Sequence, residues 1–354
     1  MRDWALLSVT TPSAMTTPSP MTMDRLALMS ASIISMSLLL IGCSTKTSSA
    51  SPPLHSTENT TAVNQQHASV KRSESAVPVP SQGWNYVRGK LKLRGIAQAD
   101  IDTIFDDPRM PPPFDITFRL KPVESSDIYK QFRTLSQVEL GRVFLERRGE
   151  ALQAMEERYG VSAEVVTAIL LVETHFGENL GEHLVLNRLA RVCSVGDPEI
   201  LAHNVRRHQA ENPAARLKDS AARAEYLEDT FFPELEALFR IGKEQGVDLF
   251  SLKGSIAGAF GIPQFLPRSL ERFGVDGDGD GTISLFNMTD AIFSTGKFLG
   301  AYGWNDARSE SQRRDVIWNY NHSSAYIDTV LWLAASIGRR PLGTEGHGPN
   351  DSRR

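Results

Sequence analysis

The sequence predicts a mainly helical fold, within the mainly α or α+β class. Apolar residues recur at spacings of three and four in several long stretches, which is typical of helices with one buried face. Strand signals are few and short. The composition is globular, with 41% hydrophobic and 23% charged residues. A net charge of −4, without basic clusters interleaved with aromatics, argues against nucleic acid as the main partner.

Four stretches carry this helical pattern most clearly. Ser136-Gln137-Val138-Glu139 has the form of a capping box, and it predicts a long helix that continues through Tyr159. A similar spacing predicts helices over 225–245 and 289–302. The apolar segment 325–337 predicts a buried helix.

The stretch 165–177 contains the most informative residue, Glu173. Ser162 is the expected N-cap of a helix that begins near Ala163, and residues three and four apart on a helix share a face. Glu173 therefore lies among apolar neighbours, which favour the protonated carboxyl group. That form is required for general-acid cleavage of a glycosidic bond. On this stretch alone, a Glu at a helix end, paired with Arg or exposed to water, is the alternative.

The N-terminal part predicts an export signal and a lipid anchor. Residues 26–41 form a mostly apolar run, which suits the core of a signal peptide. The run leads into Leu40-Ile41-Gly42-Cys43-Ser44, which resembles a bacterial lipobox with Cys43 as the lipidated residue. We expect a signal peptide over 1–43, in which 1–20 is an upstream extension. An uncleaved anchor with an incidental Cys is the alternative.

Composition also predicts the domain boundaries. Residues 44–82 are rich in Ser, Thr, Pro, Asn and Gln, and we expect them to form a disordered tether. The folded domain is expected over 83–340, followed by a disordered tail over 341–354. If Cys43 carries lipid, Cys193 is unpaired and no internal disulfide is expected.

A run of alternating acidic residues and glycines, 276–282, predicts a calcium loop. Its pattern matches the first half of an EF-hand loop, whose ligands are hard oxygen atoms. Asn287 stands where the usual final Glu would be, and Asp290 three residues later can close the site. The expected ligands are Asp276, Asp278, Asp280, Thr282 and Asp290. The ion would have a structural role. No cofactor is expected for catalysis. An acidic surface turn is the alternative.

Two further segments carry groups suited to a saccharide. The Gly-rich run 253–267 holds Ser255 and Gln264, and it lacks the ending of a phosphate-binding loop. Tight packing of the glycines is its alternative interpretation. The segment 318–326 places aromatics beside amides, a combination typical of sugar sites, although a polar loop leading into a buried helix would also account for it.

Several of these motifs, in one order, match a known family. They include Phe114-Asp115, residues 122–126, Tyr159-Gly160-Val161, residues 172–177, 254–267 and 275–281, Tyr302-Gly303-Trp304, and Tyr320-Asn321 with Tyr326. Over roughly 114–333 the chain resembles the membrane-bound lytic murein transglycosylases of the B type. The resemblance implies a lysozyme-like helical catalytic domain with an EF-hand-like calcium loop.

The resemblance also implies the activity. Glu173 would be the single catalytic residue, cleaving the β-1,4 bond between N-acetylmuramic acid and N-acetylglucosamine in peptidoglycan. The muramyl C6 hydroxyl, instead of water, would attack C1 and leave a 1,6-anhydromuramic acid end. One carboxyl group acting first as acid and then as base is enough for this reaction. The implied substrate-binding residues are Ser255, Gln264, Tyr320, Asn321 and Tyr326.

Two alternatives accompany this interpretation. One is a muramidase that hydrolyses the same bond, and the other is an inactive, calcium-stabilised, peptidoglycan-binding lipoprotein. The polar segment 192–226 looks longer than the family's usual spacing. Ser44 after Cys43 resembles the outer-membrane sorting pattern. We therefore expect a periplasmic monomer, anchored by lipid to the outer membrane, whose partners are peptidoglycan glycan strands and the membrane.

Overall fold

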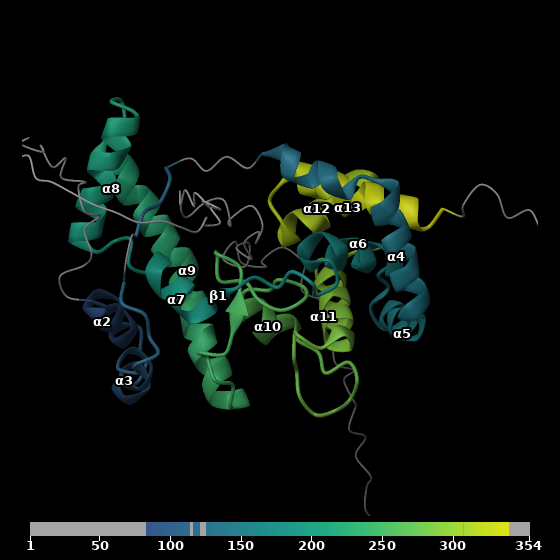
Figure 1. Cartoon of the computed structure of the whole chain (residues 1–354), viewed down its shortest axis with the longest axis horizontal. Coiled ribbons are helices and arrows are strands. Elements are labelled where there is room, and N and C mark those ends of the chain that lie inside the picture. The colour runs from purple at the N-terminus through teal and green to yellow at the C-terminus, as the bar shows by residue number, and fades with distance from the viewer. Residues whose placement is uncertain (1–82, 114–115, 121–124, 307, 340–354) are drawn as a thin grey trace, which may run out of the picture.

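The computed structural model describes residues 83–113, 116–120, 125–306 and 308–339, and this part of the chain is almost entirely helical (Figure 1). The predicted signal peptide, tether and tail, together with Cys43, lie outside the described residues. The helices are α2 (Asn85–Leu93), α3 (Gln98–Phe105), the 3-10 helix η1 (Ser126–Phe132), α4 (Leu135–Arg147), α5 (Gly149–Tyr159), α6 (Ala163–Thr174), α7 (Val185–Val192), α8 (Pro198–Glu211), α9 (Leu217–Gln245), α10 (Pro267–Phe273), α11 (Met288–Ala301), α12 (Glu310–Tyr320) and α13 (Ser324–Ile337).

Two groups of helices stand side by side in Figure 1. One group gathers α7, α8 and α9, with α2 and α3 beside them. The other gathers α4, α5, α6, α11, α12 and α13, and α10 lies between the groups. The helix α6 is central to the second group, because α13, α4, α5 and α11 all pack against it. This explains why each of its residues from Val165 to Thr174 is buried.

The two strands are very short and bring distant segments together. Residues of β1 (His183–Leu184) pair antiparallel with β2 (Lys253–Gly254). Beside this pair the backbones of Gly181 and Gly254 approach so closely that a Cβ on Gly181 would lie 2.2 Å from the Gly254 carbonyl oxygen. The segment that follows α6 is thereby fixed to the start of the Gly-rich run.

The helix predictions are confirmed in part. The bounds of α11 and α13 and the start of α6 agree with the sequence to within one residue, whereas α6 ends at Thr174, before the Gly177 that closes the apolar run. The prediction of one long helix that starts at the Ser136 box is wrong in two respects. Its N-cap is Thr134, whose hydroxyl accepts from the Gln137 amide, and Arg148 divides it into α4 and α5. The apolar spacing continues across Arg148, so the break could not be predicted from that spacing.

Other local details also differ from the sequence prediction. Ser162 occupies the N-cap position of α6, yet its hydroxyl makes no capping bond and instead donates to Asp306 at 3.1 Å. The helix expected over 225–245 begins earlier, at Leu217. The polar segment 192–226 is mostly helical, since it forms α8 and the start of α9. No described helix combines the length and the apolar character needed to cross a bilayer.

Candidate active site

The candidate site is built around Glu173, in the last turn of α6. Its side chain is buried, with 8% of the residue exposed. Its Oε1 accepts a hydrogen bond of 2.7 Å from the hydroxyl of Tyr326, in the first turn of α13. Burial, reinforced by the neighbouring Glu173 carboxylate, raises the pKa of Tyr326 well above its ordinary value. The Tyr326 hydroxyl therefore keeps its proton and remains a donor to Glu173.

Two further tyrosines surround Tyr326. The ring of Tyr320 stacks on it with a centroid distance of 6.4 Å, and Tyr129 of η1 meets it edge to face at 5.8 Å. The Tyr320 hydroxyl donates to the Pro263 carbonyl at 2.5 Å, so Tyr320 ties α12 to the Gly-rich run. Tyr129 is a member of this cluster that the sequence interpretation missed. Its segment carries no motif, and only the packing of η1 on α13 brings it here.

Asn321 directly follows α12 and is fully buried. Neither its Oδ1 nor its Nδ2 has a hydrogen-bond partner among the described residues. Buried amides are normally hydrogen-bonded, so this side chain is suited to a partner that is not part of the protein.

Ser255 and Gln264 hold the shape of the Gly-rich run. The Ser255 hydroxyl accepts from the Ala259 amide at 3.1 Å. The Gln264 side-chain amide is buried and donates to the carbonyls of Leu180, at 3.2 Å, and Gly261, at 3.0 Å. The run reaches the end of α6 because the Thr174 hydroxyl donates to the Ile262 carbonyl at 2.8 Å.

The glycines of this run are required mainly by the chain's own packing. A Cβ on Gly254 would lie 2.0 Å from the Ala259 carbonyl oxygen, and one on Gly261 would lie 2.3 Å from Leu285 Cβ. Of the two interpretations of these glycines, tight packing therefore explains these two positions.

Backbone strain is concentrated at the same place. Within the described residues, the non-glycine residues with positive φ are His175 (50°), Phe176 (58°) and Gln264 (50°). Two of them come two and three residues after Glu173, and the third lies in the run tied to α6. Strained backbone of this kind clusters at functional sites, where packing enforces it. Phe144 stacks on Phe176 at 3.9 Å and helps to hold that conformation.

The acidic loop brings three of its predicted ligands together. One oxygen from each of Asp276, Asp278 and Asp290 lies within 4.8 Å of the others. Asp290 is 1% exposed and accepts from the amides of Gly277, at 2.8 Å, and Ser284, at 2.7 Å. The sequence also suggested Asp280, which lies outside this group.

The donor set of this loop fits a hard cation. It consists of carboxylate oxygens, which are the ligands that calcium prefers. Burying a carboxylate such as that of Asp290 is costly without a compensating charge. Asp280 and Thr282 are joined by a local hydrogen bond, in which Asp280 Oδ1 accepts from the Thr282 amide at 2.7 Å.

Comparison with known proteins decides the family. The Transglycosylase SLT domain family matches residues 81–313. The chain belongs to this family. The family match covers α2 to α11 and extends into α12, so it includes Glu173, the Gly-rich run and the acidic loop.

A curated relative agrees with this assignment. The membrane-bound lytic murein transglycosylase B of Escherichia coli (strain K12) is 34% identical over 175 residues, which make up 49% of this chain and 41% of that protein. The alignment thus spans about two fifths of the length of that relative.

Solved structures of other transglycosylases share the fold. Catenated SltB1 from Pseudomonas aeruginosa superposes with a TM-score of 0.54 at 23% identity, over 73% of this chain and 97% of that one. SltB3 from the same organism, in complex with NAG-anhNAM-pentapeptide, has a TM-score of 0.52 at 20% identity, over 74% and 83% of the two chains. At these identities the likeness establishes the helical fold of the SLT domain.

Proposed function

We propose that this SLT-domain chain is a peptidoglycan lytic transglycosylase in which Glu173 is the single catalytic acid and base. The observation that carries the proposal is the Glu173 carboxyl group, which is buried at the end of α6 and held by the Tyr326 hydroxyl at 2.7 Å. The reaction is cleavage of the β-1,4 bond between N-acetylmuramic acid and N-acetylglucosamine. Family membership supports the choice of substrate.

In this proposal the two carboxyl oxygens have different tasks. Since the Tyr326 hydroxyl donates to Oε1, the catalytic proton belongs on Oε2. Glu173 gives this proton to the leaving glycosidic oxygen as the bond to C1 breaks. It then takes the proton of the muramyl C6 hydroxyl as that oxygen bonds to C1, which closes the 1,6-anhydro ring. One group thus serves both steps, and its protonation state is restored.

The other buried carboxyl groups of the described residues are engaged elsewhere. Glu228 accepts from the Tyr86 hydroxyl and the Gly196 amide, at 2.8 and 2.9 Å. Glu234 accepts from the Arg268 amide, and Asp290 belongs to the acidic loop. Glycosidases that use two carboxyl groups place both beside the scissile bond. The commitments of these three residues favour a mechanism with one protein carboxyl group.

The substrate-binding residues proposed are Ser255, Gln264, Tyr320, Asn321 and Tyr326. Asn321 is the strongest of them, because its unpartnered amide matches the donor and acceptor of a sugar acetamido group. SltB3, which shares the fold, was solved with NAG-anhNAM-pentapeptide. Tyr320 and Gln264 act on substrate through their placement of the Gly-rich run, since their polar atoms bond to its backbone.

We also propose that calcium stabilises the acidic loop. Asp276, Asp278 and Asp290 would supply carboxylate ligands, and Asp280 and the backbone carbonyl of Thr282 would complete the shell. Support comes from the convergence of the three carboxylates and from the burial of Asp290. The ion would fix the loop against α11, whose first turn contains Asp290.

The cellular setting proposed is the periplasm, with the domain of residues 83–340 tethered through 44–82 to a lipidated Cys43. The printed name of the Escherichia coli relative describes that protein as membrane-bound. The lipobox-like sequence before Cys43 supports lipid attachment, and Ser44 favours the outer membrane.

Product analysis tests the reaction directly. Purified peptidoglycan is digested with the protein and with its Glu173→Gln variant, and the fragments are identified by mass spectrometry. Anhydromuramic ends from the unaltered protein alone are expected. Reducing ends would instead identify a hydrolysing muramidase, and an absence of fragments from both proteins would favour the inactive binding lipoprotein.

A further inference from the structure

A pocket lies at the opposite end of α6 from Glu173. It has a volume of about 660 Å³ and is formed by the outer face of α13 together with parts of α5, α6, α12 and the end of η1. Ser162 and Glu164 bring the start of α6 into its wall. Nine residues of helix separate Glu164 from Glu173, which corresponds to about 14 Å. None of the proposed catalytic or substrate-binding residues lines this pocket.

The wall of the pocket contains charges of both signs. Three arginines and five carboxylates contribute to it, and Arg314 is neutralised by Asp328 at 2.6 Å and approached by Glu310 at 4.0 Å. Arg133 and Arg313 form no ion pair with any described residue. Glu156 and Glu164 likewise form no ion pair within the described part of the chain. Together with Asp306, five charges in the wall therefore have no oppositely charged partner there.

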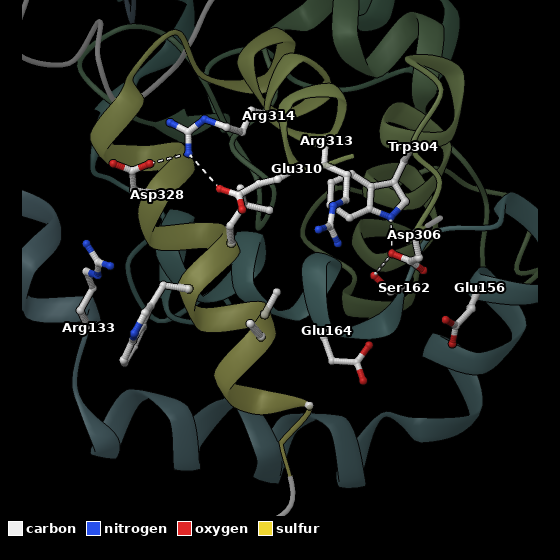
Figure 2. Close-up of a pocket in the computed structure, with 15 residues that line it drawn as sticks. Arg133, Glu156, Ser162, Glu164, Trp304, Asp306, Glu310, Arg313, Arg314 and Asp328 are labelled. Atoms are coloured by element: carbon white, nitrogen blue, oxygen red, sulfur yellow. Dashed lines mark hydrogen bonds and ion pairs between the residues drawn. The ribbon is translucent and has the colours of Figure 1, made fainter. Parts of the chain in front are cut away.

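These charges are arranged at two poles (Figure 2). Arg133 lies at one side of the view, where its guanidinium is 5.6 Å from the ring of Trp332. Asp306 and Glu156 lie at the other side. Arg313 lies nearer the second side, beside Trp304, and its Nε is buried without a hydrogen-bond partner among the described residues.

Three carboxylates lie near one another at the acidic pole. Burial raises the pKa of Glu156, and the nearby charges of Glu164 and Asp306 raise it further. Asp306 is held in place by the Trp304 indole at 3.0 Å and by the Ser162 hydroxyl at 3.1 Å. A cationic group placed here would relieve the repulsion among the three carboxylates.

This distribution of charge selects the kind of ligand. An uncharged glycan would leave both poles without counter-charges, and a phosphate or other anion would be repelled by the acidic pole. A simple cation would leave the positive charges of Arg133 and Arg313 without counter-charges. A peptide with a carboxylate at one end and an amine further along satisfies both poles. Four extended residues span at most about 14 Å, which suits a pocket of this volume.

We propose that this pocket binds the uncross-linked stem peptide of peptidoglycan, with its terminal carboxylate at Arg133 and its free side-chain amine at Glu156 and Glu164. This inference rests on the proposed function only in taking peptidoglycan as the molecule that carries the peptide. Such a site would hold the enzyme on strands whose peptides are not yet cross-linked, since cross-linking consumes the amine.

Calorimetry with a synthetic tetrapeptide tests the proposal. The probe carries a dibasic third residue with a free amine and a terminal D-alanine carboxylate, and the protein is the full-length chain in detergent. Arg133→Gln should weaken binding about tenfold, as expected for a lost charge-assisted hydrogen bond. Arg272→Gln is the matched control, because that guanidinium also lies over a ring, Phe273, at 5.0 Å, but outside the pocket.

Changes to the ligand test the same contacts without altering the protein. Converting the terminal carboxylate to an amide should weaken binding to the unaltered protein about tenfold and have no further effect on Arg133→Gln. Acetylating the amine should likewise weaken binding to the unaltered protein and have no further effect on binding to Glu164→Gln. The proposal is overturned if the tetrapeptide does not bind, if Arg272→Gln weakens binding as much as Arg133→Gln, or if ligand and protein changes act independently.

The outcome is independent of the catalytic proposal because the tetrapeptide has no glycosidic bond. Peptide binding without glycan cleavage would refute the catalytic proposal alone. Anhydromuramic products without peptide binding would refute the second site alone.

Discussion

The hydroxyl of Tyr326 donates to Oε1 of Glu173 at 2.7 Å, across 153 residues of sequence. This bond joins the end of α6 to the start of α13, and both residues are buried. It fixes the orientation of the carboxyl group before any substrate is present. Such preorganisation is a principal source of rate enhancement in enzymes.

Tyr326→Phe should therefore lower kcat roughly 10- to 100-fold. The ring that stacks on Tyr320 is kept, and only the hydroxyl that orients Glu173 is lost. Steady-state kinetics on soluble glycan strands would measure this. Tyr320→Phe removes a hydrogen bond to the Pro263 carbonyl and should have a smaller effect on kcat. Equal kcat losses in the two variants would contradict an orienting role for Tyr326.

Glu234 predicts a pH dependence of stability. Burial raises its pKa from the ordinary 4.5 to about 7. Between these values the folded protein holds a proton that the unfolded chain releases, so the free energy of unfolding falls as pH rises through this window. The full effect is about 3 kcal/mol, at about 1.36 kcal/mol for each pKa unit.

Glu234→Gln should remove this fall, because the Gln side chain keeps an acceptor for the Arg268 amide. Melting curves at about pH 5 and about pH 8 would compare the two proteins. The variant should lose less stability than the unaltered protein over that interval. An identical pH dependence would show that Glu234 does not titrate there.

Gly181→Ala should destabilise the domain by about 2 to 4 kcal/mol, because its Cβ would collide with the Gly254 backbone. Gly95 provides a matched control, since its φ of 90° resembles the 87° of Gly181 and its surroundings are open. Gly95→Ala should cost only about 1 kcal/mol for the left-handed backbone. Similar losses in urea unfolding would mean that the close approach at Gly181 is easily relaxed.

Asp278→Asn tests the calcium proposal. The variant should lower the melting temperature in calcium by several degrees and have little effect in chelator, because the ion stabilises only the folded loop. Asp280→Asn should have a smaller effect, since Asp280 lies outside the group of three converging carboxylates. Losses that are the same with calcium and with chelator would argue against a bound ion.

Local sequence patterns predicted those features that depend on nearby residues. The start of α6 follows from one apolar run, and a single carboxylate within that run marks Glu173. The convergence of Asp276, Asp278 and Asp290 follows from the spacing of a short loop.

Features that depend on distant packing were not predictable in this way. Tyr129 joins the site only because η1 packs on α13. The constraint on Gly181 arises from a segment more than 70 residues away, at Gly254. The break at Arg148 interrupts an apolar pattern that continues on both sides of it. The pocket at the start of α6 is assembled from five separate segments, and no local pattern indicates that they meet.

Turnover of peptidoglycan by Glu173→Gln, measured beside Glu178→Gln, tests the central claim most directly. Glu178 is a nearby exposed carboxylate, so it controls for the loss of one negative charge. The account predicts that Glu173→Gln releases no anhydromuramic fragments while its melting temperature is kept, and that Glu178→Gln remains active. Substantial fragment release by a folded Glu173→Gln protein would contradict the assignment of Glu173 as the catalytic acid and base.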